Sequence, residues 1–159
     1  MDNSYIDMMI DSMNKKIAIL NQLIDKTENQ KDLFKDDIEP DWDKFDTLID
    51  EKDVLINNLT ELDNGFESLF NRIKEELTNN KDKYASKIAL MQQLISEVTN
   101  LSTKLEALET RNKSLIEQKV AAGRQNLRTS KVSSQVAMNY YNKMNKINNV
   151  DPQLMDMKS

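Results

Sequence analysis

Apolar residues recur at alternating intervals of four and three along the first part of the chain. The positions are Ile6, Ile10, Met13, Ile17, Leu20, Ile24, Thr27, Lys31 and Phe34, with Met9 and Leu23 beside them. Such spacing places side chains in one stripe along a helix and is typical of helices that pack as coiled coils. Pro40 disfavours helical conformation at the residue before it. The pattern therefore predicts a helix over about residues 3–37.

Two further stretches show the same periodicity. The second follows Asp41, which can cap a helix N-terminus, and carries one polar member, Lys52. Its apolar positions are Phe45, Leu48, Leu55, Leu59, Leu62, Phe66, Leu69 and Ile73. After a polar run at 78–82, the third stretch carries Tyr84, Ile88, Met91, Ile95, Val98, Leu101, Leu105, Leu108, Leu115 and Ile116. These patterns predict helices over about 41–78 and 82–118.

The pattern changes after residue 118, where apolar positions become sparse and Asn and Ser become frequent. Residues of these types lower helix propensity, and a helix without a packed face is marginal in water. We therefore expect an all-α fold in which three long helices form an antiparallel, coiled-coil-like bundle over residues 1–118. Residues 119–159 should extend the third helix and end in a mobile tail. The sequence leaves open whether this segment is helical by itself or orders on a partner.

Composition narrows the function classes. The chain of 159 residues has 2 Gly and 2 Pro, too few for a loop-rich or all-β fold, and it has no Cys and no His. Thiolate and imidazole metal ligands are thus absent, and two glycines cannot form a Gly-rich phosphate loop. The carboxylates of Asp50, Glu51 and Asp53 are typical of a solvated helix face. These features predict a non-enzymatic protein without a metal or other cofactor.

The charge is distributed unevenly along the chain. Residues 1–118 carry 15 Lys+Arg against 25 Asp+Glu, a net charge of −10, whereas residues 119–159 carry 7 against 2, a net charge of +5. The basic residues form no run and accompany no nucleic-acid-binding motif, so a nucleic-acid partner is not expected. An adaptor that uses this basic segment on an anionic surface remains an alternative, and its binding would weaken steeply with salt.

The same patterns bear on the compartment. The start, Met1-Asp2-Asn3-Ser4, lacks the basic and apolar regions of a signal peptide. No stretch approaches the roughly 18 apolar residues of a membrane span, so stable membrane insertion is not expected. The sequence predicts a cytoplasmic protein.

Several segments resemble those of the FlgN-like flagellar export chaperones. The stretches DEKDVLINNL (50–59) and ELDNGFE (61–67) are similar to the second helix of that family. The stretch LEALETRNKSLI (105–116) is similar to its third helix, and the pair Tyr140-Tyr141 near the C-terminus also matches the family layout. The resemblance covers most of the chain.

This resemblance implies a cytoplasmic chaperone that binds the C-terminal helices of hook–filament junction subunits and delivers them to the type III export gate. The family binds its clients through the C-terminal region. Carried over, that region gives the candidate partner-binding residues Leu115, Ile116, Val120, Leu127, Val132, Val136, Tyr140 and Tyr141, and Met138 belongs to the same scattered apolar set. Two other interpretations stay open: a structural coiled-coil protein that self-assembles as a homo-oligomer, and a FliT-like chaperone for another flagellar subunit.

Overall fold

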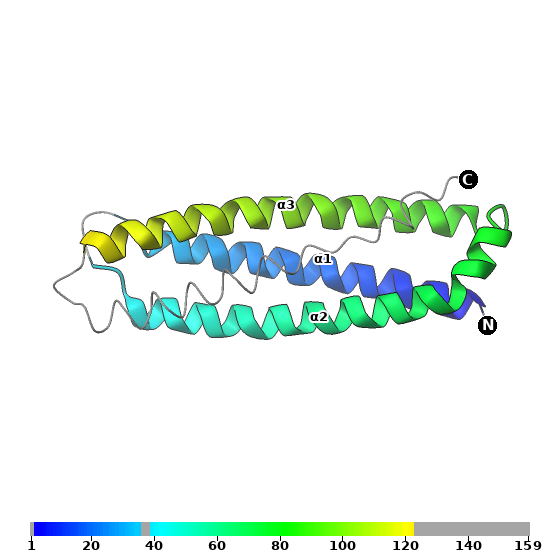
Figure 1. The fold of residues 1–159 in the computed structure, drawn as a ribbon, viewed down its shortest axis with the longest axis horizontal. Helices are drawn as coiled ribbons and strands as arrows, with labels where there is room; N and C mark the ends of the chain where they lie inside the picture. The colour runs from blue at the N-terminus through cyan, green and yellow to red at the C-terminus, as the bar shows by residue number, and fades with distance from the viewer. Residues whose placement is uncertain (1, 36–38, 123–159) are drawn as a thin grey trace.

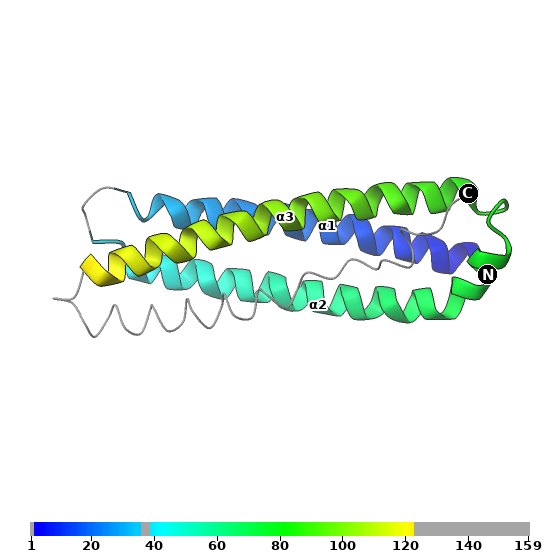
Figure 2. The same cartoon turned by 45° about the horizontal axis from the view of Figure 1, so that its top comes forward.

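The computed structural model describes residues 2–35 and 39–122, which form a rod of three helices (Figure 1). Helix α1 spans Asp2–Asp32, α2 spans Trp42–Asn79 and α3 spans Ala85–Ala122. Helix α2 runs antiparallel to α1 and α3, and α1 lies along both of them. Figure 2 shows α3 crossing over α1 along the length of the rod. At 1.5 Å per residue, a helix of 38 residues is about 57 Å long. The predicted all-α bundle is confirmed.

The helix ends differ from the sequence prediction at α1. This helix stops at Asp32 rather than near residue 37. The backbone N–H of Leu33 donates to the carbonyl of Gln30 at 3.1 Å, which tightens the last turn. The turn directs the Phe34 ring into the core. Helix α2 begins as predicted, because the Asp41 carboxylate accepts a hydrogen bond from the Lys44 N–H at 3.1 Å.

The buried face of α1 departs from the predicted stripe at three positions, because Ile10 and Ile17 are only half-buried and Lys31 is exposed. The buried residues of α1 are Ile6, Met9, Met13, Lys16, Leu20, Leu23, Ile24, Thr27 and Gln30, and Phe34 is buried just beyond the helix. Gln30 is therefore buried and Lys31 exposed, the reverse of the prediction. The other members of the predicted stripe, Ile24 among them, are buried as predicted. Because α1 packs against two helices, its apolar surface is wide. The hydrophobic pattern therefore does not determine which residues lie at the middle of the buried face.

Some predicted core positions of the other two helices are also only half-buried. Leu62, Phe66 and Leu69 of α2, predicted in the core, are only half-buried. The buried positions of α2 are Trp42, Phe45, Ile49, Lys52, Leu55, Ile56, Leu59, Phe70, Ile73 and Leu77. In α3 they are Ile88, Met91, Leu94, Ile95, Val98, Leu105, Glu109, Asn112 and Ile116, while Leu101, Leu108 and Leu115 are half-buried. Tyr84, just before this helix, is also buried. Each helix therefore places polar side chains among its buried residues.

The polar core positions occur in two places along the rod. One is the ion pair between Lys16 of α1 and Asp63 of α2, whose charged atoms lie 2.6 Å apart. Burial raises the pKa of Asp63 despite the nearby Lys16. The second, larger group lies toward the end where α1 and α3 finish, and it is described below. Apolar clusters fill the core on either side.

Candidate functional site

Three aromatic rings close the end of the bundle where α1 stops and α2 begins. Phe34 follows α1, and Trp42 and Phe45 occupy the first turn of α2. The Phe45 ring centroid lies 5.6 Å from that of Phe34 and 5.6 Å from that of Trp42. The Trp42–Phe45 pair is edge-to-face, a favoured arrangement of aromatic quadrupoles. We call Phe34, Trp42 and Phe45 the aromatic cluster.

The last described turns of α3 belong to the same end of the bundle. Ile116 is 1% exposed and lies in the core cluster that contains the aromatic rings. Leu115 and Val120 are half-buried and pack against that cluster. Leu115 and Val120 therefore pack against the bundle and still expose some apolar surface, whereas the side chain of Ile116 is buried in the core. The other candidate partner-binding residues lie outside the described residues: Leu127, Val132, Val136, Met138, Tyr140 and Tyr141.

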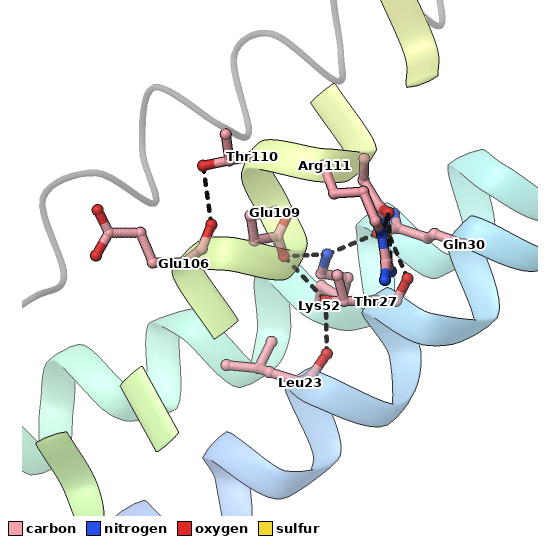
Figure 3. A network of polar contacts seen from close by, with 9 residues as sticks. Leu23, Thr27, Gln30, Lys52, Glu106, Glu109, Thr110 and Arg111 are labelled. Carbon is pink, nitrogen blue, oxygen red and sulfur yellow. Dashed lines mark hydrogen bonds and ion pairs between the residues drawn. The ribbon is translucent and has the colours of Figure 1, made fainter. Parts of the chain in front are cut away.

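A layer of buried polar side chains crosses the bundle next to this end (Figure 3). Lys52 of α2 is 0% exposed, and its ammonium group donates to the side-chain oxygen of Gln30 at 2.7 Å. The same ammonium group also forms an ion pair with the Glu109 carboxylate of α3. The hydroxyl of Thr27 lies 3.0 Å from this carboxylate and 2.6 Å from the carbonyl of Leu23. We call Thr27, Gln30, Lys52, Glu109 and Asn112 the polar layer.

Asn112 completes the polar layer one turn further along α3. Its side-chain amide donates to the backbone carbonyl of Thr27 at 2.8 Å. Its oxygen accepts from the Arg111 guanidinium, which also lies 3.5 Å from the Glu28 carboxylate. These contacts join α1 to α3 directly, while Lys52 joins α2 to both helices. The polar layer thus links all three helices at one level.

The electrostatics of the polar layer are dominated by burial. Burial lowers the pKa of Lys52 from 10.5 to about 8, although the ion pair with Glu109 opposes this effect. Removing a charge from water is costly, and the attraction of its partner compensates only when the geometry is good. The layer is therefore expected to specify an arrangement of helices more than to add stability.

The heptad stripes predicted from the sequence include two members of this layer, Thr27 and Lys52. Lys52 stands out as a polar residue within an apolar stripe. Glu109 follows Leu108 and Gln30 precedes Lys31, and both Leu108 and Lys31 also fit the heptad pattern. The pattern therefore does not predict that Glu109 and Gln30 are the buried residues. Their burial could be found only by asking which residues of the other helices can pair with a buried lysine.

Shallow grooves follow the boundary between α1 and α2. One of about 490 Å³ lies beside the aromatic cluster, with Leu33 and Leu48 as apolar lining. Its polar lining is mainly acidic: Asp41, Asp43 and Glu51 with Asn29, Lys44 and Thr47. Within residues 2–35 and 39–122, no group of three or more Asp, Glu, His or Cys side chains is placed to hold a metal ion. None of the described helices is long and apolar enough to cross a membrane.

The described residues thus form a bundle of three heptad-patterned helices with shallow grooves along its surface. The family model described as FlgN protein matches residues 1–148. The chain therefore belongs to the FlgN family and is a flagellar export chaperone of type III export. Searches of curated proteins and of solved structures found no significant match.

Proposed function

We propose that this chaperone binds the C-terminal helices of hook–filament junction subunits in the cytoplasm and delivers them to the type III export gate. Membership of the FlgN family carries this proposal. The proposed client-binding surface comprises the end of α3 and the segment beyond it. Its members are Leu115, Ile116, Val120, Leu127, Val132, Val136, Met138, Tyr140 and Tyr141.

The described part of this surface supports such a role. Leu115 and Val120 are half-buried on α3 and retain apolar surface for a partner helix. Ile116 is buried and would act by holding this turn of α3 against the bundle. Beyond α3, Val132 and Val136 stand four residues apart, the spacing of anchors in helix-in-groove recognition. The net charge of +5 over 119–159 would speed encounter with an acidic client surface.

The test is calorimetry of the full chain with a synthetic peptide from the C-terminus of a hook–filament junction subunit. The double variant Val132→Asp with Val136→Asp places charge on the proposed apolar face, and we expect binding to weaken at least about 100-fold. Val54→Asp is the matched control, because Val54 is 60% exposed on α2 and should bind like the parent. Equal peptide affinity of the parent and the double variant would show that Val132 and Val136 do not belong to the client-binding surface.

Deletion of residues 123–159 tests the segment as a whole. The deletion starts at 123 because Val120 packs against the core and should be kept. We expect circular dichroism to show a folded helical body and calorimetry to show no binding of the peptide. Retained binding would place the interface on the bundle itself. A stable oligomer that ignores the peptide would favour the self-assembling structural protein instead.

Delivery to the export gate requires a measurement in cells. A strain lacking this chaperone should secrete less of the junction subunit, and the full chain should restore secretion. A variant that binds the peptide normally but fails to restore secretion would identify residues used at the gate. Unchanged secretion without the chaperone would contradict the delivery step.

A further inference from the structure

Helix α3 carries two overlapping heptad faces, and either of them could pack into the bundle. The observed core face includes Leu105, Glu109, Asn112 and Ile116. A second heptad face includes Leu101, Leu105, Leu108, Asn112 and Leu115. Successive residues on a helix are 100° apart, so a rotation of α3 about its own axis by about 50° would exchange the two faces.

Apolar burial alone does not select the observed face. The observed rotation buries the Glu109 carboxyl group and leaves Leu101, Leu108 and Leu115 half-buried. The alternative rotation would bury those three leucines and release Glu109 toward water. The release of Glu109 favours the alternative, because the burial of a carboxylate is costly. The apolar change is mixed, since the three leucines would gain burial while Ile116, now 1% exposed, would lose it. These burial terms do not by themselves select the observed rotation of α3.

The polar layer supplies contacts that exist in only one rotation. Glu109 meets the ammonium group of Lys52 and the hydroxyl of Thr27 at its carboxylate (Figure 3). Because side chains reach about 5–6 Å from the helix axis, a 50° rotation would move this carboxylate by about 5 Å. Neither contact would survive, and the buried ammonium group of Lys52 would lose the carboxylate of its ion pair. Breaking a buried ion pair by removing one partner is strongly destabilising.

We propose that Lys52, supported by Gln30, fixes the rotation of α3 through Glu109, and thereby keeps Leu108 and Leu115 at the surface and Ile116 in the core. Lys52 and Gln30 are positioning residues in this role. The proposal does not depend on the identity of the client. It determines which side chains the end of α3 presents to any partner.

The absence of cysteine from the chain gives a direct measurement. Leu115→Cys and Ile116→Cys place single thiols on the outer and core faces of the same turn. In the parent background, the thiol at position 115 should react with a maleimide at least about 10-fold faster than the thiol at position 116, because the latter reacts only after local opening. Equal rates in the parent would overturn the proposal.

The decisive background is Gln30→Leu with Lys52→Leu, which removes both positioning residues and leaves Glu109 without its cation. We expect α3 to turn, so that the ratio of the two thiol rates inverts. The matched control is Lys26→Leu with Glu51→Leu, which removes an exposed α1–α2 ion pair of 2.5 Å and should keep the parental ratio. A folded double variant that keeps the parental ratio would refute the role of Lys52.

Two further variants keep the test informative if the double variant fails to fold. Adding Glu109→Leu makes both faces apolar at this level, so the rate ratio should fall toward one. The charge swap Lys52→Glu with Glu109→Lys rebuilds the ion pair and should restore the parental ratio. A parental ratio in the apolar triple variant, or an inverted ratio in a folded charge swap, would contradict the proposal.

Discussion

Truncation of Phe45 to alanine is expected to destabilise the end of the bundle that carries the proposed client-binding surface. Phe45 is 0% exposed, and its ring contacts both Phe34 and Trp42. Replacing a buried phenylalanine with alanine removes apolar burial and leaves a cavity, which costs about 3–5 kcal/mol. Each aromatic pair adds about 0.5–1.5 kcal/mol, which places Phe45 toward the upper part of that range.

Urea denaturation followed by fluorescence of Trp42, the only tryptophan, measures this loss directly. With a urea slope of about 2 kcal/mol per molar, a loss of 4 kcal/mol lowers the midpoint by about 2 M. Phe66→Ala is the matched control, because Phe66 is half-buried on the same helix and should lower stability by only about 1–2 kcal/mol. A loss below about 1 kcal/mol for Phe45→Ala would show that the aromatic cluster does not support this end.

Two other predictions concern single residues of α2. The lowered pKa of Lys52, about 8 against 10.5, means that the unfolded chain binds more protons between these pH values. The free energy of unfolding of the parent should therefore rise by about 3 kcal/mol across that pH window, and that of Lys52→Met should not. Urea denaturation at a series of pH values from about 7.5 to about 10.5 measures this difference. The same dependence of stability on pH in both proteins would contradict the prediction. Gly65 is an exposed helix-interior glycine, and a Cβ there would meet no atom within 4 Å. Gly65→Ala should thus raise stability by about 0.5–1 kcal/mol, whereas a loss would indicate a required bend.

The sequence alone determined the number of helices and most of their boundaries. Heptad spacing is a local property, because residues three and four apart share a helix face whatever packs against it. Asp41 and Pro40 likewise act on adjacent residues, so the start of α2 was predictable. The end of α1 was not, since Phe34 leaves the helix for contacts with Trp42 and Phe45 beyond the intervening loop.

The candidate site was predictable only to the level of a region. The resemblance pointed to the C-terminal part of α3, and the structure separates its described members by exposure. Leu115 and Val120 keep apolar surface, while Ile116 is buried. Adjacent residues point 100° apart on a helix, so their exposure depends on which face the neighbouring helices cover. The sequence has apolar residues at both 115 and 116, so its hydrophobic pattern does not show which of the two is buried.

Only the tertiary structure decided which heptad face of each helix packs into the core of the bundle. Gln30 rather than Lys31, and Glu109 rather than Leu108, occupy the core. Both choices depend on Lys52, which is separated from Glu109 by 57 residues in the sequence. Apolar periodicity fixes a helix to a stripe about 100° wide and leaves the rotation within that width undetermined. A buried charge removes this freedom, because its partners must come to it from the other helices.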